Sequence, residues 1–117
     1  MMISRSIKVF TKPAGFNPKK APEGTLYVDG RRLKFPLKCR RWKPADRFRP
    51  FGMKGFKKLS DFFIDLKLDV EEKKRQIVVT TLDKKGVEQI VCIVGKRIDD
   101  RWKVTAATKQ IVSITKV

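Results

Sequence analysis

Histidine is absent from this sequence of 117 residues. Serine–histidine–acid triads and cysteine–histidine nucleophile pairs both need an imidazole, so neither can be built here. Zinc sites with histidine ligands are excluded for the same reason. The sequence also contains no cluster of metal ligands and no nucleotide-binding loop. We therefore expect no catalytic residue, no metal ion and no cofactor in this chain.

Cysteine is scarce as well. Cys39 and Cys92 are too few for a disulfide scaffold, and each lies in a strand-like run of residues. We interpret both as reduced, half-buried thiols that fill the interior of a cytosolic protein. A disulfide between them is the alternative.

Long hydrophobic runs are missing. One of the longest is five residues, Ile90 to Val94, whereas a helix needs about 20 apolar residues to span a bilayer. The first ten residues lack the apolar centre of a signal peptide. These features predict a cytoplasmic protein that does not cross a membrane.

Acidic residues are few, and their scarcity is local. The chain has 29 Lys and Arg against 12 Asp and Glu, a net charge of +17. Residues 1–58 hold 17 of these cations and three of the acids, a net of +14, whereas residues 59–117 hold 12 and nine, a net of +3. This excess predicts a polyanionic partner, either nucleic acid or an anionic membrane face. A solvated basic face without a partner is the alternative.

The densest positive segment, residues 39–58, predicts a site for a phosphate backbone. Arginine binds phosphate through two parallel hydrogen bonds, and four of the eight cations here are Arg. The segment ends where we expect a helix to begin, and free amides at a helix start favour an anion. The candidate nucleic-acid-binding residues are Arg40, Arg41, Lys43, Arg47, Arg49, Lys54, Lys57 and Lys58.

Proline and glycine residues occur at intervals in the same segment. Gly52 and Gly55 let backbone amides approach a ligand closely. Asp46, the one acid among these cations, is expected to orient Arg47 or to cap a turn rather than to catalyse. The expected loop-shaping residues are Pro44, Asp46, Pro50, Gly52 and Gly55.

Aromatic residues are interleaved with these cations, namely Trp42, Phe48, Phe51 and Phe56. They can stack on bases. They can equally anchor the loop to the hydrophobic core, and we favour that interpretation.

The first half of the chain reads as strands and loops. Residues 3–11 alternate as a strand, and the Pro-rich segment 12–24 predicts a mobile loop. Asp29-Gly30 between residues 25–28 and 31–35 predicts a hairpin with a type I′ turn. Residues 37–42 read as another strand.

The second half adds one clear helix. Leu59, Phe62, Phe63 and Leu66 lie on one face of an amphipathic helix over about 57–67. Asp69 with Glu72 indicates the cap of a second, short helix that ends near Arg75. Residues 76–82 and 87–94 predict a hairpin whose second strand is covered on both faces, with the helix packed on this sheet. Further strand candidates are 97–105 and 110–117. The fold class is therefore α+β, strand-dominated, with mainly antiparallel sheet.

One stretch carries a family resemblance. RRWKPADRFRPFGMKGFKKLSDFFID, residues 40–65, resembles the signature of the C-terminal domain of tRNA(Ile)-lysidine synthetases. FPLKCR (35–40) and IVGKRIDDRWKVTAAT (93–108) match as well, so the similarity covers about residues 25–117. The one departure inside the signature is Ala45, where the family usually has Gly.

The resemblance implies a fold and a role. The family's enzyme uses ATP, with Mg²⁺, to adenylate the wobble cytidine of a minor isoleucine tRNA, and then attaches lysine to it. That chemistry belongs to an N-terminal domain with a Ser-Gly-Gly-x-Asp-Ser loop, which is absent from this sequence. Residues 1–117 are thus expected to be a single, non-catalytic C-terminal domain that binds the acceptor-stem region of the tRNA. The implied fold resembles a domain of the phenylalanyl-tRNA synthetase β chain.

Other functions stay open beside this one. Composition alone allows a stand-alone structural RNA-binding protein of ribosomal type. A binder of anionic membranes is a third possibility, although the predicted helix carries Asp61 and Asp65 on its polar side. An independent enzyme is disfavoured, because Asp99 and Asp100 are expected to flank a turn and to pair with Arg97 or Arg101. The oligomeric state is left open.

Overall fold

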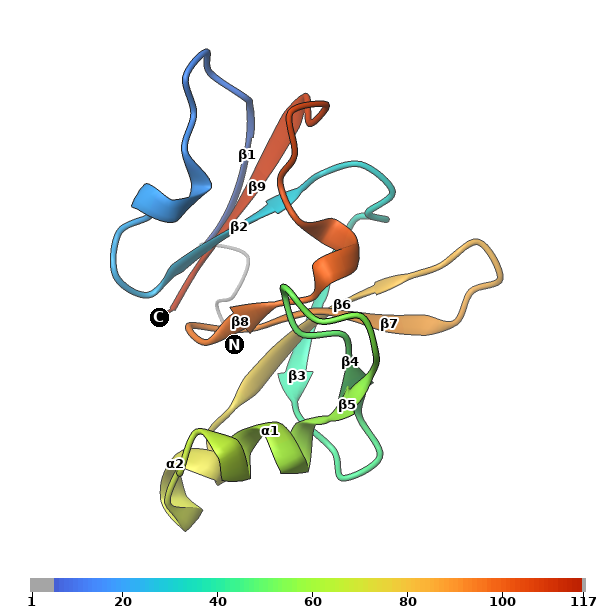
Figure 1. Cartoon of the computed structure of the whole chain (residues 1–117). Coiled ribbons are helices and arrows are strands. Elements are labelled where there is room, and N and C mark those ends of the chain that lie inside the picture. The colour runs from blue at the N-terminus through green and yellow to red at the C-terminus, as the bar shows by residue number, and fades with distance from the viewer. Residues whose placement is uncertain (1–5, 117) are drawn as a thin grey trace.

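The computed structural model describes residues 6–116, which form three layers (Figure 1). A three-stranded sheet lies against one face of a four-stranded sheet, and a helix with a two-stranded ribbon covers the other face. The four-stranded sheet is therefore buried on both sides. The result is the strand-dominated α+β architecture, with antiparallel sheets and one main helix, that the sequence predicts.

The outer sheet joins segments that are far apart in the sequence. Its strands are β1 (Ile7–Thr11), β9 (Gln110–Thr115) and β2 (Thr25–Asp29), in that order and antiparallel. Both neighbours of the central strand β9 thus come from the first 29 residues. The strand predicted over 3–11 is confirmed from Ile7 onward, and residues 3–5 lie outside the described residues.

The central sheet is built on the predicted hairpin. β6 (Ile77–Leu82) and β7 (Glu88–Ile93) pair antiparallel around a turn at residues 83–86. β3 (Lys38–Arg41) confirms the strand predicted over residues 37–42 and pairs with β6. The short strand β8 (Arg97–Ile98) pairs with β7.

A β-bulge in β7 lets this strand contribute to two hydrophobic cores. The register with β6 shifts between Val79 and Thr80, so Val91 is an extra residue on β7. Because of this bulge, Val91 and Cys92 both pack between the two sheets, while the isoleucines on either side of them pack under the helix. The apolar run is thus buried on both faces, as predicted.

The predicted main helix is confirmed as α1 (Leu59–Asp65). It begins later than expected because residues 57–58 form β5 (Lys57–Lys58), which pairs with β4 (Arg47–Phe48). It ends before Lys67, whose φ of 58° is left-handed. The buried face consists of Leu59, Phe62 and Phe63.

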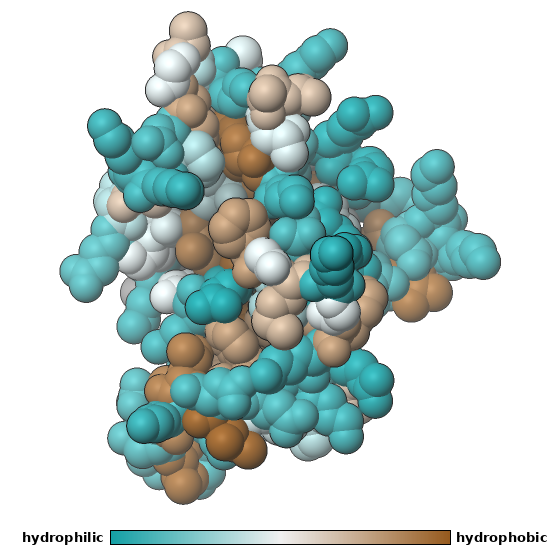
Figure 2. Space-filling model, in the orientation of Figure 1, coloured by the Kyte–Doolittle hydropathy of each residue, from teal (hydrophilic) through white to brown (hydrophobic). Residues whose placement is uncertain are grey.

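The second predicted helix is α2 (Val70–Lys74). The Asp69 carboxylate caps it by accepting from the amide of Glu72 (2.8 Å), as the sequence indicates. Figure 2 shows hydrophobic side chains gathered over α1 and α2, where Ile64, Leu66 and Val70 are exposed. None of the described helices is long and apolar enough to cross a membrane.

The hairpin predicted at Asp29-Gly30 is wrong. β2 pairs with β9, and residues 31–35 contain no strand. Neither Asp29 nor Gly30 has the positive φ that a type I′ turn needs. The Asp29 carboxylate instead accepts from the amide of Arg31 (2.8 Å). The chain crosses here from the outer sheet to the central one, and Leu33 packs against the core between them.

The strand predicted over 97–105 is also largely wrong. Only Arg97–Ile98 is a strand, because Asp99 then turns the chain. Its carboxylate accepts from the amide of Arg101 (2.8 Å) and caps a 3₁₀ turn over Asp100–Trp102.

The segment 12–24 contains no strand among its residues and carries one 3₁₀ turn, Pro18–Lys20. It is a loop, as predicted. Phe16 packs there against Tyr27, with ring centroids 4.9 Å apart. The mobility of this loop stays a prediction.

Both cysteines are free thiols in this structure. Cys92 is buried and Cys39 is partly buried. Burial raises the pKa of Cys39 to about 11, and it raises the pKa of Cys92 as well, so both thiols stay protonated near neutral pH. The predicted half-burial is confirmed for Cys39, whereas Cys92 is fully buried.

We expect Phe63→Ala to destabilise the protein by about 3–5 kcal/mol, because Phe63 is fully buried between α1 and the central sheet. The neighbouring Ile64 is 62% exposed, so Ile64→Ala is the matched control and should change stability by roughly 0.5 kcal/mol or less. Urea unfolding of both variants measures the difference. Equal losses would contradict the packing of α1 on the sheet.

Candidate nucleic-acid interface

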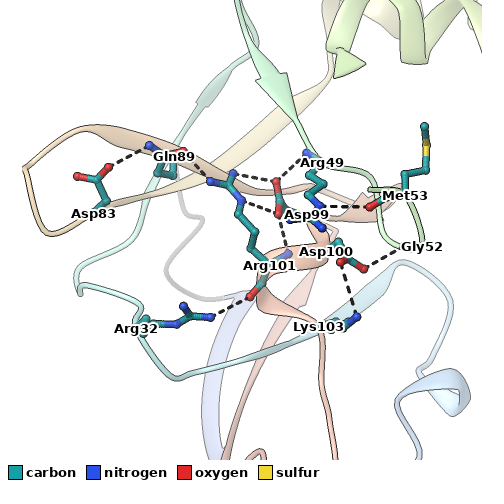
Figure 3. Close-up of polar contacts among 10 residues, drawn as sticks. All are labelled: Arg32, Arg49, Gly52, Met53, Asp83, Gln89, Asp99, Asp100, Arg101 and Lys103. Carbon is teal, nitrogen blue, oxygen red and sulfur yellow. Dashed lines mark hydrogen bonds and ion pairs between the residues drawn. The ribbon is translucent and has the colours of Figure 1, made fainter. Parts of the chain in front are cut away.

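A buried carboxylate, Asp99, organises the most exposed part of the predicted basic segment. Its two oxygens accept four hydrogen bonds, which Figure 3 shows. Three come from the amide and guanidinium of Arg101, at 2.8–2.9 Å, and the fourth comes from the amide of Arg49 (2.8 Å). A fully buried charge is tolerable only when it is paired in this way.

The loop between β4 and β5 is fastened to this cluster by its backbone. The amide of Asp100 donates to the carbonyl of Arg49 (2.7 Å), and the amide of Phe51 donates to the carbonyl of Ile98 (3.1 Å). The Asp100 carboxylate accepts from the amide of Gly52 (3.1 Å). The tip of the loop therefore has a defined position, although most of its side chains lie in solvent.

The aromatic residues of the segment divide into two groups. Phe48 is fully buried against α1, and Trp42 packs on the same core and donates through Nε1 to the carbonyl of Lys73 (2.7 Å). Phe51 and Phe56 are 49% and 56% exposed on the loop. The Arg101 guanidinium lies 4.9 Å from the centroid of the Phe56 ring. The predicted anchoring to the core is thus confirmed for Trp42 and Phe48 and is wrong for Phe51 and Phe56.

Arg40 is held inside the protein by two acids. Its guanidinium donates to both oxygens of Asp46 (2.9 and 3.0 Å) and to both oxygens of Glu88 (2.9 and 3.2 Å). Hydrogen bonds from Arg40 and Thr80 hold the pKa of Glu88 below its usual range, against the opposing effect of burial. Arg40 therefore positions neighbouring groups, and little of its charge faces solvent.

Asp46 caps a turn, as one of its two predicted roles required. Its carboxylate accepts from the amide of Lys43 (2.7 Å), and its amide donates back to the carbonyl of Lys43 (2.9 Å). The prediction that Asp46 orients Arg47 is wrong, because the cation that Asp46 binds is Arg40. Pro44 lies within this turn, and Ala45 has no positive φ.

The anion site expected at the helix start stays a prediction, and one of its amides is already used. The first amide of α1, that of Leu59, donates to the carbonyl of Asp46 (3.1 Å). Gly52 does require glycine, since its φ is 88°. Gly55 has no positive φ, and an added side-chain carbon would meet nothing within 4 Å. Pro50 is buried and bridges to Asp99.

Several predicted cations remain without an acid partner. Lys57 pairs with Asp65, but six others form no ion pair within residues 6–116. Arg47 lies directly opposite Lys58 in the β4–β5 ribbon, and like charges so placed repel each other. An anion bridging them would remove that repulsion. The six are Arg41, Lys43, Arg47, Arg49, Lys54 and Lys58.

Sequence reasoning did not select Asp99 and Arg101 as site-forming residues. The resemblance over 93–108 contained the available signal, since these two residues lie inside it. Their contact with the loop 49–53 depends on long-range pairing that spacing along the chain does not reveal. Among the described residues, no three His, Cys, Asp or Glu lie together as a metal site.

The comparison with protein families is decisive. The family model described as the TilS substrate C-terminal domain matches residues 37–114, which include every candidate site residue. The chain belongs to this family. A tRNA(Ile)-lysidine synthase of Parabacteroides distasonis is 43% identical over 88 residues, covering 75% of this chain and 19% of that protein. The chain thus spans about a fifth of the length of the curated relatives it matches.

Solved structures confirm the fold that the TilS resemblance implies. The crystal structure of a TilS C-terminal domain matches with a TM-score of 0.66 and 21% identity, covering 98% of this chain and 87% of that one. An N-terminal fragment of the phenylalanyl-tRNA synthetase β-subunit from Pyrococcus horikoshii matches with a TM-score of 0.56 and 18% identity, covering 76% of this chain and 26% of that one.

Asp99→Ala should destabilise the TilS-type domain by about 2–3 kcal/mol, because it leaves the part-buried amide of Arg49 and the Nε and Nη2 groups of Arg101 without an acceptor. Hydrogen exchange should become faster at the amides of residues 49 and 101. Glu23→Ala, at an exposed acid, is the control and should change stability by roughly 0.5 kcal/mol or less. Unchanged exchange in Asp99→Ala would show that the carboxylate does not hold the loop.

Glu88→Gln should make stability less dependent on acid. A carboxyl whose pKa is lower in the folded state stabilises the protein above its unfolded pKa, and this contribution is lost as pH falls through the folded value. We expect the free energy of unfolding of wild type to exceed that of Glu88→Gln by about 1 kcal/mol or less at about pH 7, and by a smaller amount near pH 3. Urea unfolding at both pH values measures this. A pH-independent difference would contradict the role of the Arg40 ion pair.

Proposed function

We propose that this chain is the tRNA-binding domain of a tRNA(Ile)-lysidine synthase. The observation that carries the proposal is the set of six cations on and beside the β4–β5 ribbon that have no acid partner within residues 6–116. Carboxylates neutralise Arg40, Lys57 and Arg101, and those that pair with Arg40 and Arg101 are largely buried. Unpaired positive charge therefore remains on and beside the ribbon, and membership of the TilS family supports tRNA as its partner.

Double-stranded RNA suits such a surface. A-form RNA is recognised through its phosphates, its 2′-hydroxyls and its shape rather than by reading bases in the deep groove. Arg41, Arg47 and Arg49 supply guanidinium groups that bind phosphate with two hydrogen bonds. Lys43, Lys54 and Lys58 supply point charges. We assign this surface to the acceptor-stem region of a minor isoleucine tRNA, as the family resemblance implies.

The chemistry is assigned to the rest of the enzyme. About four-fifths of the length of the matched relatives lies outside this chain. In this proposal, that part uses ATP, Mg²⁺ and lysine in the cytoplasm to form the carbon–nitrogen bond at the wobble cytidine. Residues 1–117 act as a single domain that holds the tRNA and perform no catalytic step.

A stand-alone structural RNA-binding protein of ribosomal type is the competing function. The match to lysidine synthases disfavours it. Competition at fixed salt between the minor isoleucine tRNA, elongator methionine tRNA and a ribosomal RNA fragment distinguishes the two. We expect both tRNAs to compete better than the ribosomal fragment, and the reverse order would favour the alternative.

Arg47→Ala and Arg49→Ala should each weaken tRNA binding several-fold and reduce its dependence on salt. If about six phosphates are contacted, the logarithm of the binding constant should fall by roughly 4–5 units per decade of salt, and each substitution should lower that slope by about 0.7–0.9. Filter binding or fluorescence anisotropy across a salt series measures both quantities.

Arg75→Ala is the matched control for charge. Arg75 is exposed at the end of α2, and only its backbone makes hydrogen bonds with described residues. This variant should keep the affinity and slope of wild type. If Arg47→Ala and Arg49→Ala also kept the wild-type affinity and salt slope, the β4–β5 ribbon would not be part of the RNA interface.

A further inference from the structure

A cleft beside the basic surface is not explained by binding of a duplex. It encloses about 690 Å³ between residues 34–38, the far end of β6, and Glu88 on β7. That volume is within the range of about 300–1,000 Å³ usual for small-molecule sites. Arg40 and Lys43 line one side of it, so the cleft is continuous with the proposed RNA surface.

Apolar side chains form one wall of the cleft. Phe35, Pro36, Leu37 and Leu82 line it. Phe35 is 51% exposed and Leu82 is also exposed. An exposed aromatic ring beside a cleft of this size offers a flat surface on which a planar group can stack.

Cations border the apolar wall. Lys34, Lys38 and Lys43 line the cleft and have no acid partner among the described residues. The one acid in the lining, Glu88, is already bound to Arg40. The unpaired charge around the cleft is therefore positive, which favours an anionic ligand over a cationic or neutral one.

The hydroxyls in the cleft are used by the protein itself. Thr80 donates to Glu88 (2.9 Å), and the Thr81 oxygen accepts from the amide of Lys34 (2.8 Å). Thr81 also lies 3.4 Å from the carbonyl of Lys34, to which it donates. A ligand would thus meet stacking surface and positive charge but few groups able to read the edge of a base.

We propose that this cleft binds one unpaired nucleotide of the RNA, with its base stacked on Phe35 and its phosphates near Lys34, Lys38 and Lys43. The inference rests on the proposed RNA-binding function and adds a single-stranded element to it. Stacking together with positive charge is the pattern by which proteins bind single strands with little preference for base. The site should accept purines and pyrimidines alike.

The test compares two RNA hairpins that share one stem. One has a short unpaired 3′ extension and the other a blunt end, and the 117-residue chain is titrated with each at fixed salt. Wild type should bind the extended hairpin about tenfold more tightly, the size expected for one stacked base. Extensions of A and of U should differ by less than about threefold.

Variants locate the effect in the cleft. Phe35→Ala should abolish the preference for the extended hairpin while keeping the affinity for the blunt one. Phe35→Trp should keep the preference, and with the extended hairpin its fluorescence should change more than that of wild type, which contains only Trp42 and Trp102. Ile64→Ala removes a comparable exposed apolar side chain from α1, which does not line the cleft, and should behave as wild type.

The outcomes separate this proposal from the broader one. Equal affinity of wild type for both hairpins, or a preference that survives Phe35→Ala, would overturn the nucleotide site and leave the duplex-binding function standing. Failure to bind either hairpin, or the tRNA, would overturn the RNA-binding function itself.

Discussion

Burial of the β6–β7 hairpin on both faces is the constraint on which the rest of the structure depends. The bulge at Val91 directs two consecutive side chains of β7 into the core between the sheets. The flanking isoleucines remain available to α1 on the opposite face. With both faces covered by other layers, the central sheet interacts with solvent chiefly through its edges and its hairpin end. The loops and short ribbon around it are where ligand-binding side chains can gather.

The distribution of carboxylates decides which of the many cations face solvent. Asp46 and Glu88 hold Arg40, and Asp99 holds Arg101, so these guanidinium groups brace the backbone. In the β4–β5 ribbon, Lys57 pairs with Asp65, whereas Arg47 and Lys58, which face each other, have no acid partner among the described residues. Ion pairing thus withdraws Arg40 and Arg101 from contact with a ligand, whereas Arg47 and Lys58 are available for one.

Local patterns predicted much of the fold. The spacing of Leu59, Phe62 and Phe63 identified α1, and Asp69 identified the start of α2. Asp29-Gly30 misled because its turn preference is weaker than the pairing of β2 with β9, some 80 residues away. Long-range contacts also explain the incomplete prediction of the site.

The same limit applies to individual side chains. From the sequence, Arg40 was indistinguishable from Arg41, because Glu88 approaches it only across the folded sheet. Phe48 and Phe51 likewise looked equivalent, yet one lies in the core and the other on the loop. The cleft at Phe35 was not predicted at all, since it is formed by segments more than 40 residues apart.

The central position of β9 in the outer sheet has a consequence for the order of folding. During synthesis, β1 and β2 emerge early, but neither pairs with the other, and both wait for a strand near residue 115. Contacts at such sequence separation form slowly because a long loop must close before they stabilise anything. The β6–β7 hairpin and α1, whose contacts are more local, are therefore available first as a platform onto which the outer sheet assembles.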